Sequence, residues 1–244
     1  MELTGERTTP GIWHENYWFR RHEVAYLFAA PLAAGQEVLE AGCGEGYGAQ
    51  ALLDAGAARV IALDYDAEAA AHVRRTYAGV PVVRGNLVAL PLPDRCVDLV
   101  VSYQVVEHLW DAPGYVAECA RALRSEGRLL LSTPNRPVFS PGLGRGEKPL
   151  NPFHSQEYDA DELVGLVEAE GLAVEAVLGV HHGDAIARFE QARGPLVDAQ
   201  LARPPETWDS ELAGFVSSLT AADFDLRDEG VDEALDLLVI AMRP

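Results

Sequence analysis

The chain has 244 residues, and its 38 acidic and 19 basic side chains give a formal net charge of −19. This length predicts one large domain, or one domain with a subdomain, and an apolar content of 48% is enough for a sizeable core. The charge argues against nucleic-acid or anionic-membrane partners, because both require a basic face. The three cysteines, Cys43, Cys96 and Cys119, lack metal-ligand spacing and favour reduced thiols in a cytoplasmic protein. No signal peptide and no apolar run of about 18 residues is visible.

Strand and helix signals alternate along the first half of the chain. Residues 17–30 have apolar side chains near helical spacing, and we expect Pro31 to end that helix. The sequence then predicts strands at 37–41, 59–64, 80–85, 97–103 and 127–133. It predicts intervening helices at about 47–55, from about residue 66, and near 112–124. This alternation indicates an α/β sheet with helices on both faces, whose strands end at one ligand-binding edge.

The pattern loosens after residue 134. Residues 134–154 contain five prolines and predict a long loop. Asp159 and Glu162 have the spacing of a capping box, which opens a helix that runs to about Glu170. Two further strands are expected at 172–180 and 234–243. The polar, helix-like insertion at 183–230 between them is a natural place for a lid or an acceptor-selecting element.

A run of alternate glycines follows the first strand, in the stretch VLEAGCGEGYG at 38–48. Glycine lets the backbone approach a ligand closely and adopt positive φ, so this loop predicts a small-molecule cradle. Gly44-x-Gly46-x-x-Ala49, with Asp64 twenty residues after Gly44, also fits an NAD-binding pattern. Glu40 argues against NAD, because its carboxylate would repel a diphosphate but could accept a hydrogen bond from an ammonium group.

Taken together, the motifs resemble the class I, Rossmann-like S-adenosylmethionine-dependent methyltransferases. The matching segments are VLEAGCGEGYGA, VIALDYD, GNLVALPLPDRCVDLVVSYQVVEHLWD, CARALRSEGRLLLSTPN and LDLLVIAMR, in that order. The resemblance implies S-adenosylmethionine as the cofactor and a doubly wound, seven-stranded sheet whose last strand is antiparallel. It divides the chain into an N-terminal helical lid segment, 1–34, and a methyltransferase domain, 35–244, in which 183–230 is the lid over the acceptor.

The resemblance also implies which residues bind the cofactor. Those of the glycine loop and the strand before it would hold the methionyl part: Glu40, Gly42, Cys43, Gly44 and Gly46. After the second strand, Asp64 would bind the ribose and Tyr65 would flank the adenine. After the third strand, Asn86 and Leu87 would contact the adenine. After the fourth strand, Gln104 and Val105 would lie under the sulfonium side.

The N-terminal stretch YWFRRH at 17–22 has two interpretations. Its aromatic side chains, Tyr17 among them, could close over the cofactor, while Arg21 pairs with the cofactor's carboxylate. Alternatively, the stretch is an amphipathic helix that packs Trp18 and Phe19 and leaves its arginines in water. We favour the first interpretation.

A hydroxyl acceptor requires a base, because an alcohol is a weak nucleophile. Glu107 and His108, just past the fourth strand, are the first candidates, although an acid-histidine pair here could merely orient the loop. His154 is the second candidate; the alternative is that it packs on Glu157 or caps the next helix. His181 and His182 rank third. Some quinone-pathway O-methyltransferases bind a divalent metal through a similar E-x-x-E-H motif, but this chain has Gln104 at the first position, so we expect no metal.

The leading hypothesis is a cytoplasmic S-adenosylmethionine-dependent O-methyltransferase acting on a hydroxyl of a sugar, a polysaccharide or another small polar acceptor. The saccharide follows from resemblance to an actinobacterial subgroup of the class. Two alternatives stay open: a C- or N-methyltransferase for a quinone, lipid or secondary metabolite, and a cofactor-binding regulatory or partner protein. We expect no nucleic-acid or membrane partner and allow for a homodimer.

Overall fold

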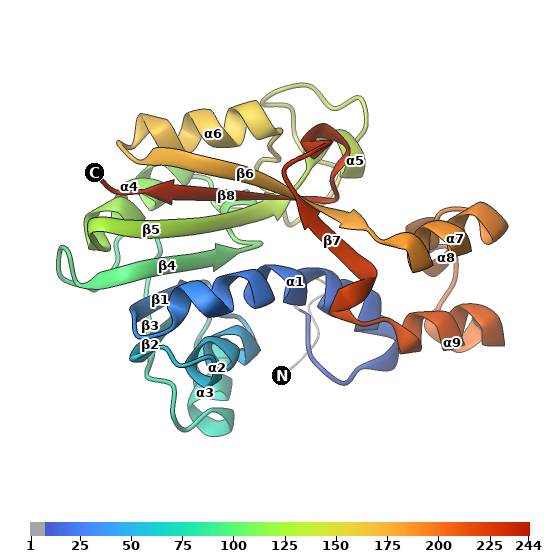
Figure 1. The fold of residues 1–244 in the computed structure, drawn as a ribbon, viewed down its shortest axis with the longest axis horizontal. Coiled ribbons are helices and arrows are strands. Elements are labelled where there is room, and N and C mark those ends of the chain that lie inside the picture. The colour runs from blue at the N-terminus through green and yellow to red at the C-terminus, as the bar shows by residue number, and fades with distance from the viewer. Residues whose placement is uncertain (1–7) are drawn as a thin grey trace.

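The structure, a computed structural model, describes residues 8–244 and is built on one eight-stranded sheet (Figure 1). The strand order is β3-β2-β1-β4-β5-β8-β6-β7. Strands β1 to β5 are parallel to one another, and β8 runs antiparallel to both β5 and β6. The expected doubly wound α/β fold with an antiparallel last strand is thereby confirmed. The strands are β1 (Glu37–Ala41), β2 (Arg59–Asp64), β3 (Val82–Arg84), β4 (Val97–Tyr103), β5 (Leu123–Pro134), β6 (Ala173–His182), β7 (Phe224–Arg227) and β8 (Asp236–Met242).

The edge strand β7 lies within a segment that the sequence predicted as helical. It pairs antiparallel with the end of β6, from Gly179 to His182. Only four residues form β7, and the polar positions among them mask the strand signal. The sheet therefore has one strand more than the seven expected.

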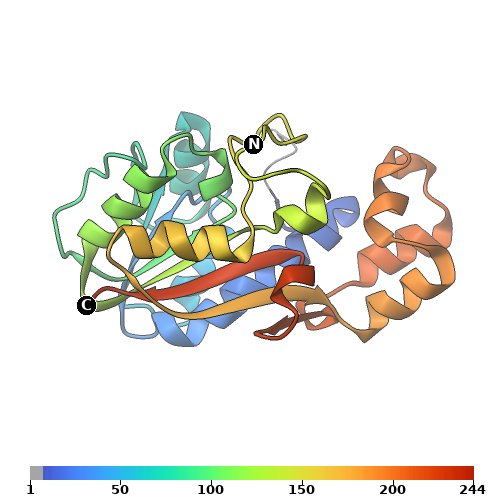
Figure 2. The ribbon, with the colours of Figure 1, turned by 90° about the horizontal axis from the view of Figure 1, so that it is seen from above.

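Helices cover both faces of the sheet (Figure 2). Along β1, Val38 packs toward α1, α2 and α3, while its neighbour Leu39 packs toward α4 and α6. This alternation is the period of two that a strand requires. The helices are α1 (Asn16–Ala33), α2 (Tyr47–Asp54), α3 (Ala67–Thr76), α4 (Ala112–Ala122), α5 (Arg136–Phe139), α6 (Ala160–Ala169), α7 (Asp184–Arg193), α8 (Leu196–Leu201) and α9 (Ser210–Ser218).

Helix α1 continues through Pro31 to Ala33, so the expectation that Pro31 ends it was wrong. A proline inside a helix removes the hydrogen bond to the carbonyl four residues earlier, here that of Leu27. Leu27 is 59% exposed, so water can reach this side of the helix and replace the lost bond. The capping box of Asp159 and Glu162 at the start of α6 is present as expected.

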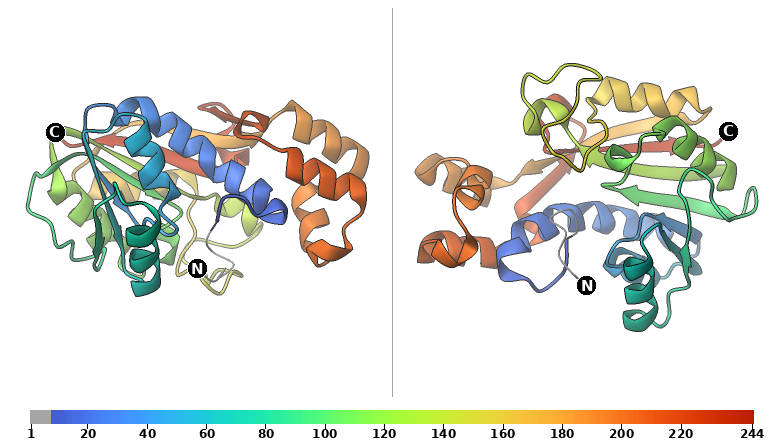
Figure 3. Two further views of the ribbon diagram at one scale, coloured as in Figure 1. Left: turned by 90° about the horizontal axis from the view of Figure 1, so that it is seen from below. Right: turned by 180° about the vertical axis from the view of Figure 1, so that it is seen from behind.

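The insertion forms a cluster of its own at one end of the sheet. Figure 3 shows α7, α8 and α9 gathered beside the first half of α1. Ile186, Leu196 and Val216 from these helices are buried together with Tyr17 and Val24 of α1. The insertion is therefore packed against the N-terminal helix. Within residues 8–244, no helix has the length and apolarity to cross a membrane.

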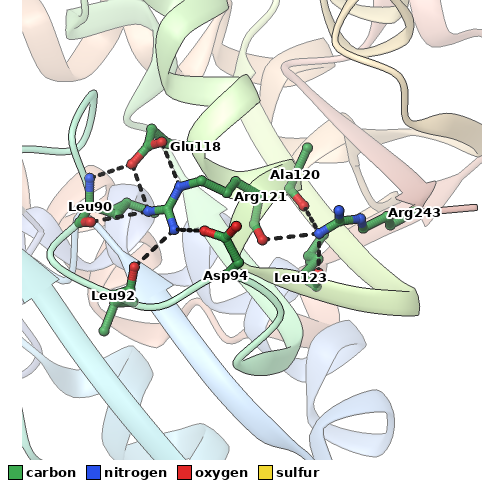
Figure 4. A network of polar contacts seen from close by, with 8 residues as sticks. All are labelled: Leu90, Leu92, Asp94, Glu118, Ala120, Arg121, Leu123 and Arg243. Atoms are coloured by element: carbon green, nitrogen blue, oxygen red, sulfur yellow. Dashed lines mark hydrogen bonds and ion pairs between the residues drawn. The ribbon is translucent and has the colours of Figure 1, made fainter.

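Two arginines hold the loop between β3 and β4 and the end of α4 (Figure 4). The Arg121 guanidinium donates to the carbonyls of Leu90 and Leu92 and pairs with Glu118 and Asp94. Arg243 donates to the last carbonyls of α4, which lack partners within the helix. These side-chain bonds, together with backbone bonds from the Arg95 and Cys96 amides to the last residues of α4, fix the segment after β3 to α4.

We expect Arg121→Ala to lower the free energy of unfolding by about 1–3 kcal/mol, because it leaves loop carbonyls and Glu118 without their charged donor. Arg121→Lys should recover only part of the loss, since an ammonium cannot reproduce the planar set of donors. Urea denaturation followed by circular dichroism measures both. An unchanged unfolding midpoint in Arg121→Ala would show that the network does not hold the loop.

Candidate active site

The glycine loop after β1 needs glycine for two different reasons. Gly42, Gly44 and Gly46 have φ of 85°, 51° and 97°, which other residues rarely adopt. Gly48 has ordinary φ but no room: an added Cβ would lie 2.2 Å from Glu40 Oε1 and 2.2 Å from the Tyr26 ring. At Gly42, an added Cβ would lie 2.4 Å from the Val105 side chain. The glycine loop is therefore in close contact with the side chains of Glu40, Tyr26 and Val105.

The first cavity, of about 420 Å³, opens above this loop. It lies where β1, β2 and β4 end, next to the point where the strand order reverses between β1 and β4, which is the usual ligand site of such sheets. Its lining comes from α1, the strand ends and the loop before α6: Thr8, His22, Tyr26, Gly42, Cys43, Gly44, Glu45, Tyr47, Asp64, Tyr65, Leu87, Tyr103, Gln104, Val105, His108, Leu109 and Phe153.

Glu40 lies buried beneath the cavity. Its Oε1 accepts a hydrogen bond of 2.8 Å from the Tyr26 hydroxyl, and Tyr26 itself reaches the cavity. Its Oε2 has no hydrogen-bond partner in the described chain. Burial raises the pKa of Glu40 to about 8, and the Tyr26 hydrogen bond offsets part of that rise. A buried carboxyl with an open oxygen fits a ligand that brings an ammonium group close to the glycine loop.

Asp64 and Tyr65, at the end of β2, both line the first cavity. Asp64 Oδ2 accepts from the Gly44 amide, and its Oδ1 accepts from the Asp66 amide, each at 2.8 Å. A carboxylate offers about four acceptor sites, so Asp64 can still bind ribose hydroxyls. Tyr65 is 69% exposed at the rim, where a flat ligand can lie against it.

Besides the buried Glu40, two of the cofactor residues expected in the loops after β1 and β3, Gly46 and Asn86, lie off the cavity wall. The side chain of Asn86 is exposed, and its Oδ1 accepts from the Val88 amide at 3.1 Å, whereas its neighbour Leu87 lines the cavity. Gly46 instead packs toward α3, where an added Cβ would lie 2.6 Å from Val73. The structure thus gives Asn86 and Gly46 roles in shaping the loops, not in lining the cavity.

Gln104 stands where the first cavity meets a second one, also of about 420 Å³. Its φ of 57° is unusual for a residue other than glycine, and such strain is typical of functional sites. Its amide nitrogen lies 3.3 Å from both Ser132 Oγ and Asp236 Oδ1. The second cavity is lined by Thr8, Glu15, Trp18, Arg21, His22, Gln104, Glu107, His108, Pro134, Phe139, Ser140, Leu150, Asn151, His154, Glu157, Val197 and Leu201.

Neither Tyr17 nor Arg21 lines the first cavity, contrary to expectation. Tyr17 is fully buried, and its hydroxyl lies 2.8 Å from His182 Nε2 on the side of the insertion. Arg21 lines the second cavity, where its Nε lies 2.8 Å from Asp236 Oδ2. Positions 17 and 21 are one helical turn apart and share a face of α1, so both turn away from the first cavity.

Another face of α1 supplies cavity residues that sequence reasoning missed. His22 and Tyr26 are one turn apart, and both line the first cavity. Burial and the neighbouring Arg21 lower the pKa of His22 to about 3, which keeps its ring neutral at pH 7. The spacing of four was readable in the sequence. The sequence did not indicate which face of α1 meets the glycine loop.

Three candidates for catalysis, Glu107, His108 and His154, come together at the second cavity, with potential ligand atoms all within 4.8 Å of one another. We call these three residues the Glu-His-His cluster. The rings of His108 and His154 are 5.1 Å apart between centroids, and Glu107 Oε2 accepts from the Thr133 hydroxyl at 3.2 Å. Burial raises the pKa of Glu107.

The histidine rings of the cluster are oriented by their surroundings. His108 Nδ1 lies 3.0 Å from the Phe153 carbonyl oxygen, and because a carbonyl only accepts, Nδ1 must carry the proton. His154 Nδ1 lies 2.8 Å from Glu157 Oε1. The contact with Glu157 that the alternative interpretation of His154 expects is therefore present. The third-ranked pair, His181 and His182, lines neither cavity.

We predict that binding of S-adenosylhomocysteine, which carries the same ammonium group as the expected cofactor, tightens by up to about 10-fold per pH unit from pH 6 to 8. Glu40 is protonated below its pKa of about 8 in the free protein, and a nearby cation favours the ionised form. Titration calorimetry in buffers of different ionisation enthalpy measures the proton released.

The matched control is Glu40→Gln, which should bind more weakly and with a flat pH profile over this range. Since the folded-state pKa is raised, the free wild-type protein should also lose stability as pH rises from about 4.5 to 8. Identical pH profiles in the two proteins would contradict this role of Glu40.

Comparisons with known proteins agree with this geometry. The family described as a methyltransferase domain matches residues 39–131. A probable S-adenosylmethionine-dependent methyltransferase of Mycolicibacterium smegmatis is 50% identical over 250 residues, which cover 100% of this chain and 96% of that protein. One from Mycobacterium tuberculosis is 49% identical over 251 residues, with 100% and 90% covered.

Solved structures share the fold at lower identity. An S-adenosylmethionine dependent methyltransferase from Mesorhizobium loti superposes with a TM-score of 0.59 at 20% identity, covering 90% of this chain and 98% of that one. The [4+2]-cyclase SpnF gives 0.61 at 18%, covering 91% and 80%. At such identity these structures show the fold alone, and a fold can host different chemistry. The full-length similarity to the mycobacterial proteins, together with the glycine-loop cavity, shows the family. The chain belongs to the S-adenosylmethionine-dependent methyltransferases.

Proposed function

We propose that this methyltransferase methylates a hydroxyl group of a small polar acceptor, such as a sugar or polysaccharide. The observation that carries the proposal is the position of the Glu-His-His cluster. His108 lines both cavities, while Glu107 and His154 line the second. A group that can remove a proton therefore stands at the junction between the site for the methyl donor and the space for an acceptor.

The first cavity would hold the cofactor, S-adenosylmethionine, which supplies a methyl group on a sulfonium with a good leaving group. The residues of the chain then need to align the acceptor and exclude water. Gln104, His22 and His108 line both cavities and would surround the place where donor and acceptor meet.

The cluster is suited to taking a proton from a hydroxyl. With Nδ1 of His108 donating to Phe153, its Nε2 is the ring atom that can accept. In His154, Nδ1 faces the Glu157 carboxylate, and Nε2 lies 3.0 Å from the Asn151 amide, which would have to turn away before that atom could accept a proton. The buried carboxylate of Glu107 would stabilise the positive charge that an imidazole gains. A positioned base of this kind contributes about 10²- to 10⁴-fold to the rate.

The lining of the second cavity supports a polar acceptor with one flat, less polar face. Glu15, Ser140 and Asn151 offer hydrogen-bonding groups, while Trp18 and Phe139 offer aromatic surfaces. This combination suits a sugar ring, whose hydroxyls point outward and whose C–H face stacks on aromatic rings.

The insertion contributes to the same cavity. Val197 and Leu201 of α8 belong to its lining. Helix α8 is part of the cluster that packs against the first half of α1. We propose on this ground that residues 183–230 act as the acceptor-selecting lid.

We predict that His108→Ala lowers turnover with hydroxyl acceptors by about 10²- to 10⁴-fold, because it removes the proton acceptor at the junction. Affinity for S-adenosylhomocysteine should change only a few-fold, which shows that the fold is retained. The measurement is release of S-adenosylhomocysteine across a panel of saccharides, amines and quinols.

His181→Asn is the control, because His181 lies outside both cavities; it should keep wild-type turnover. Unchanged turnover in His108→Ala would remove the cluster from the reaction. Turnover with amines or quinols alone would favour N- or C-methylation over the proposed O-methylation.

A further inference from the structure

We propose that the Glu-His-His cluster is a binding site for a divalent transition-metal ion in the wall of the second cavity. Glu107, His108 and His154 each offer one ligand atom, and these atoms lie within 4.8 Å of one another. Glu107 and His108 belong to the short 3₁₀-helix η2 (Val106–His108) after β4, and His154 comes from the loop before α6. Two elements far apart in the chain thus place three ligand-type side chains around one point.

Both histidines have the outer partners that metal-bound histidines use. Such ligands donate their second ring N–H to a carboxylate or a backbone carbonyl, which fixes the ring and the tautomer. His154 has the carboxylate of Glu157 at 2.8 Å, and His108 has the carbonyl of Phe153 at 3.0 Å. In each ring Nε2 would be the coordinating atom, and the ion would take the place of its present contacts, such as that of His154 Nε2 with the Asn151 amide.

The charges around the cluster favour a cation. Glu107 and Glu157 are 1% and 3% exposed, and both line the second cavity. Glu157 Oε2 has no hydrogen-bond partner among the described residues. Among the described residues that line this cavity, the one arginine, Arg21, is paired with Asp236. Buried carboxylates require a positive partner, and a bound ion would supply it.

The ligand types indicate the class of ion. Two imidazoles and one carboxylate suit Zn²⁺, Co²⁺ or Mn²⁺, whereas Mg²⁺ and Ca²⁺ prefer oxygen ligands. Metal bonds of about 2.0–2.2 Å place neighbouring ligand atoms roughly 3–3.5 Å apart, so the cluster must contract on binding. The loop before α6 would supply this movement, and the Asn151 amide, now 3.0 Å from His154 Nε2, would turn away.

This inference revises the expectation of no metal, which rested on Gln104 at the first position of the motif. The amide of Gln104 lies instead near Ser132 and Asp236. The third ligand comes from the distant loop. Three protein ligands leave positions open for acceptor oxygens, where a cation would lower the pKa of a bound hydroxyl. The Nε2 atoms that hold the ion could not then act as the base, so the proton would leave to water. Only this last role rests on the proposed function.

The test is titration of tag-free, chelator-treated full-length protein with Co²⁺, Mn²⁺ and Mg²⁺, followed by calorimetry and, for Co²⁺, by its visible spectrum. We expect one Co²⁺ per chain, Mn²⁺ binding at the same site, and weaker binding of Mg²⁺. His154→Ala should weaken Co²⁺ binding at least roughly 10- to 100-fold and change the spectrum. His72→Gln, a matched change at a histidine on α3, should bind like the wild type.

Binding of S-adenosylhomocysteine by each variant shows that it is folded. No Co²⁺ binding by the wild type, equal binding by His154→Ala, or preference for Mg²⁺ would overturn the proposed site. Turnover of hydroxyl acceptors by a chain that binds no metal would overturn the site yet leave the proposed function intact. If the chain binds Co²⁺ through His154 but methylates only nitrogen or carbon, the metal site stands and the proposed O-methylation is overturned.

Discussion

The hydrogen bond from Tyr26 to the buried Glu40, packed against Gly48, is the contact on which the site depends. It joins α1 to the end of β1 and to the first turn of α2, and any side chain at position 48 would displace it. With α1 fixed in this way, His22 and Tyr26 face the glycine loop while Arg21 faces the second cavity. Helix α1 thereby contributes to the walls of both cavities.

Most of the fold could be predicted from the sequence because its signals are local. Buried parallel strands such as Val97–Tyr103 are continuous apolar runs, and the glycine loop is a contiguous motif. The errors arose where tertiary contacts override local preference. Pro31 stays inside α1, and β7 forms only because the end of β6 offers an unpaired edge.

The same difference between local and tertiary signals explains which residues of the candidate site could be predicted. Asp64 and Gln104 follow strands and were placed correctly at the cavity edge. Tyr17 was misplaced because helical periodicity defines faces without saying which face meets the loop. Asn86 lies off the cavity wall because its side chain bonds its own turn. The meeting of His154 with the motif after β4 depends on the path of a long loop, which no local pattern encodes.

The proposal for the acceptor of this methyltransferase rests on the second cavity. Its Glu-His-His cluster borders the first cavity, and its remaining lining combines polar groups with aromatic and aliphatic side chains. The central claim is that the methyl group goes to an oxygen. Incubating the enzyme with cofactor labelled with ¹³C in the methyl group and a saccharide mixture, then assigning the labelled product by NMR, tests this directly. The account predicts a methyl ether on a sugar hydroxyl; a label found only on nitrogen or carbon would contradict it.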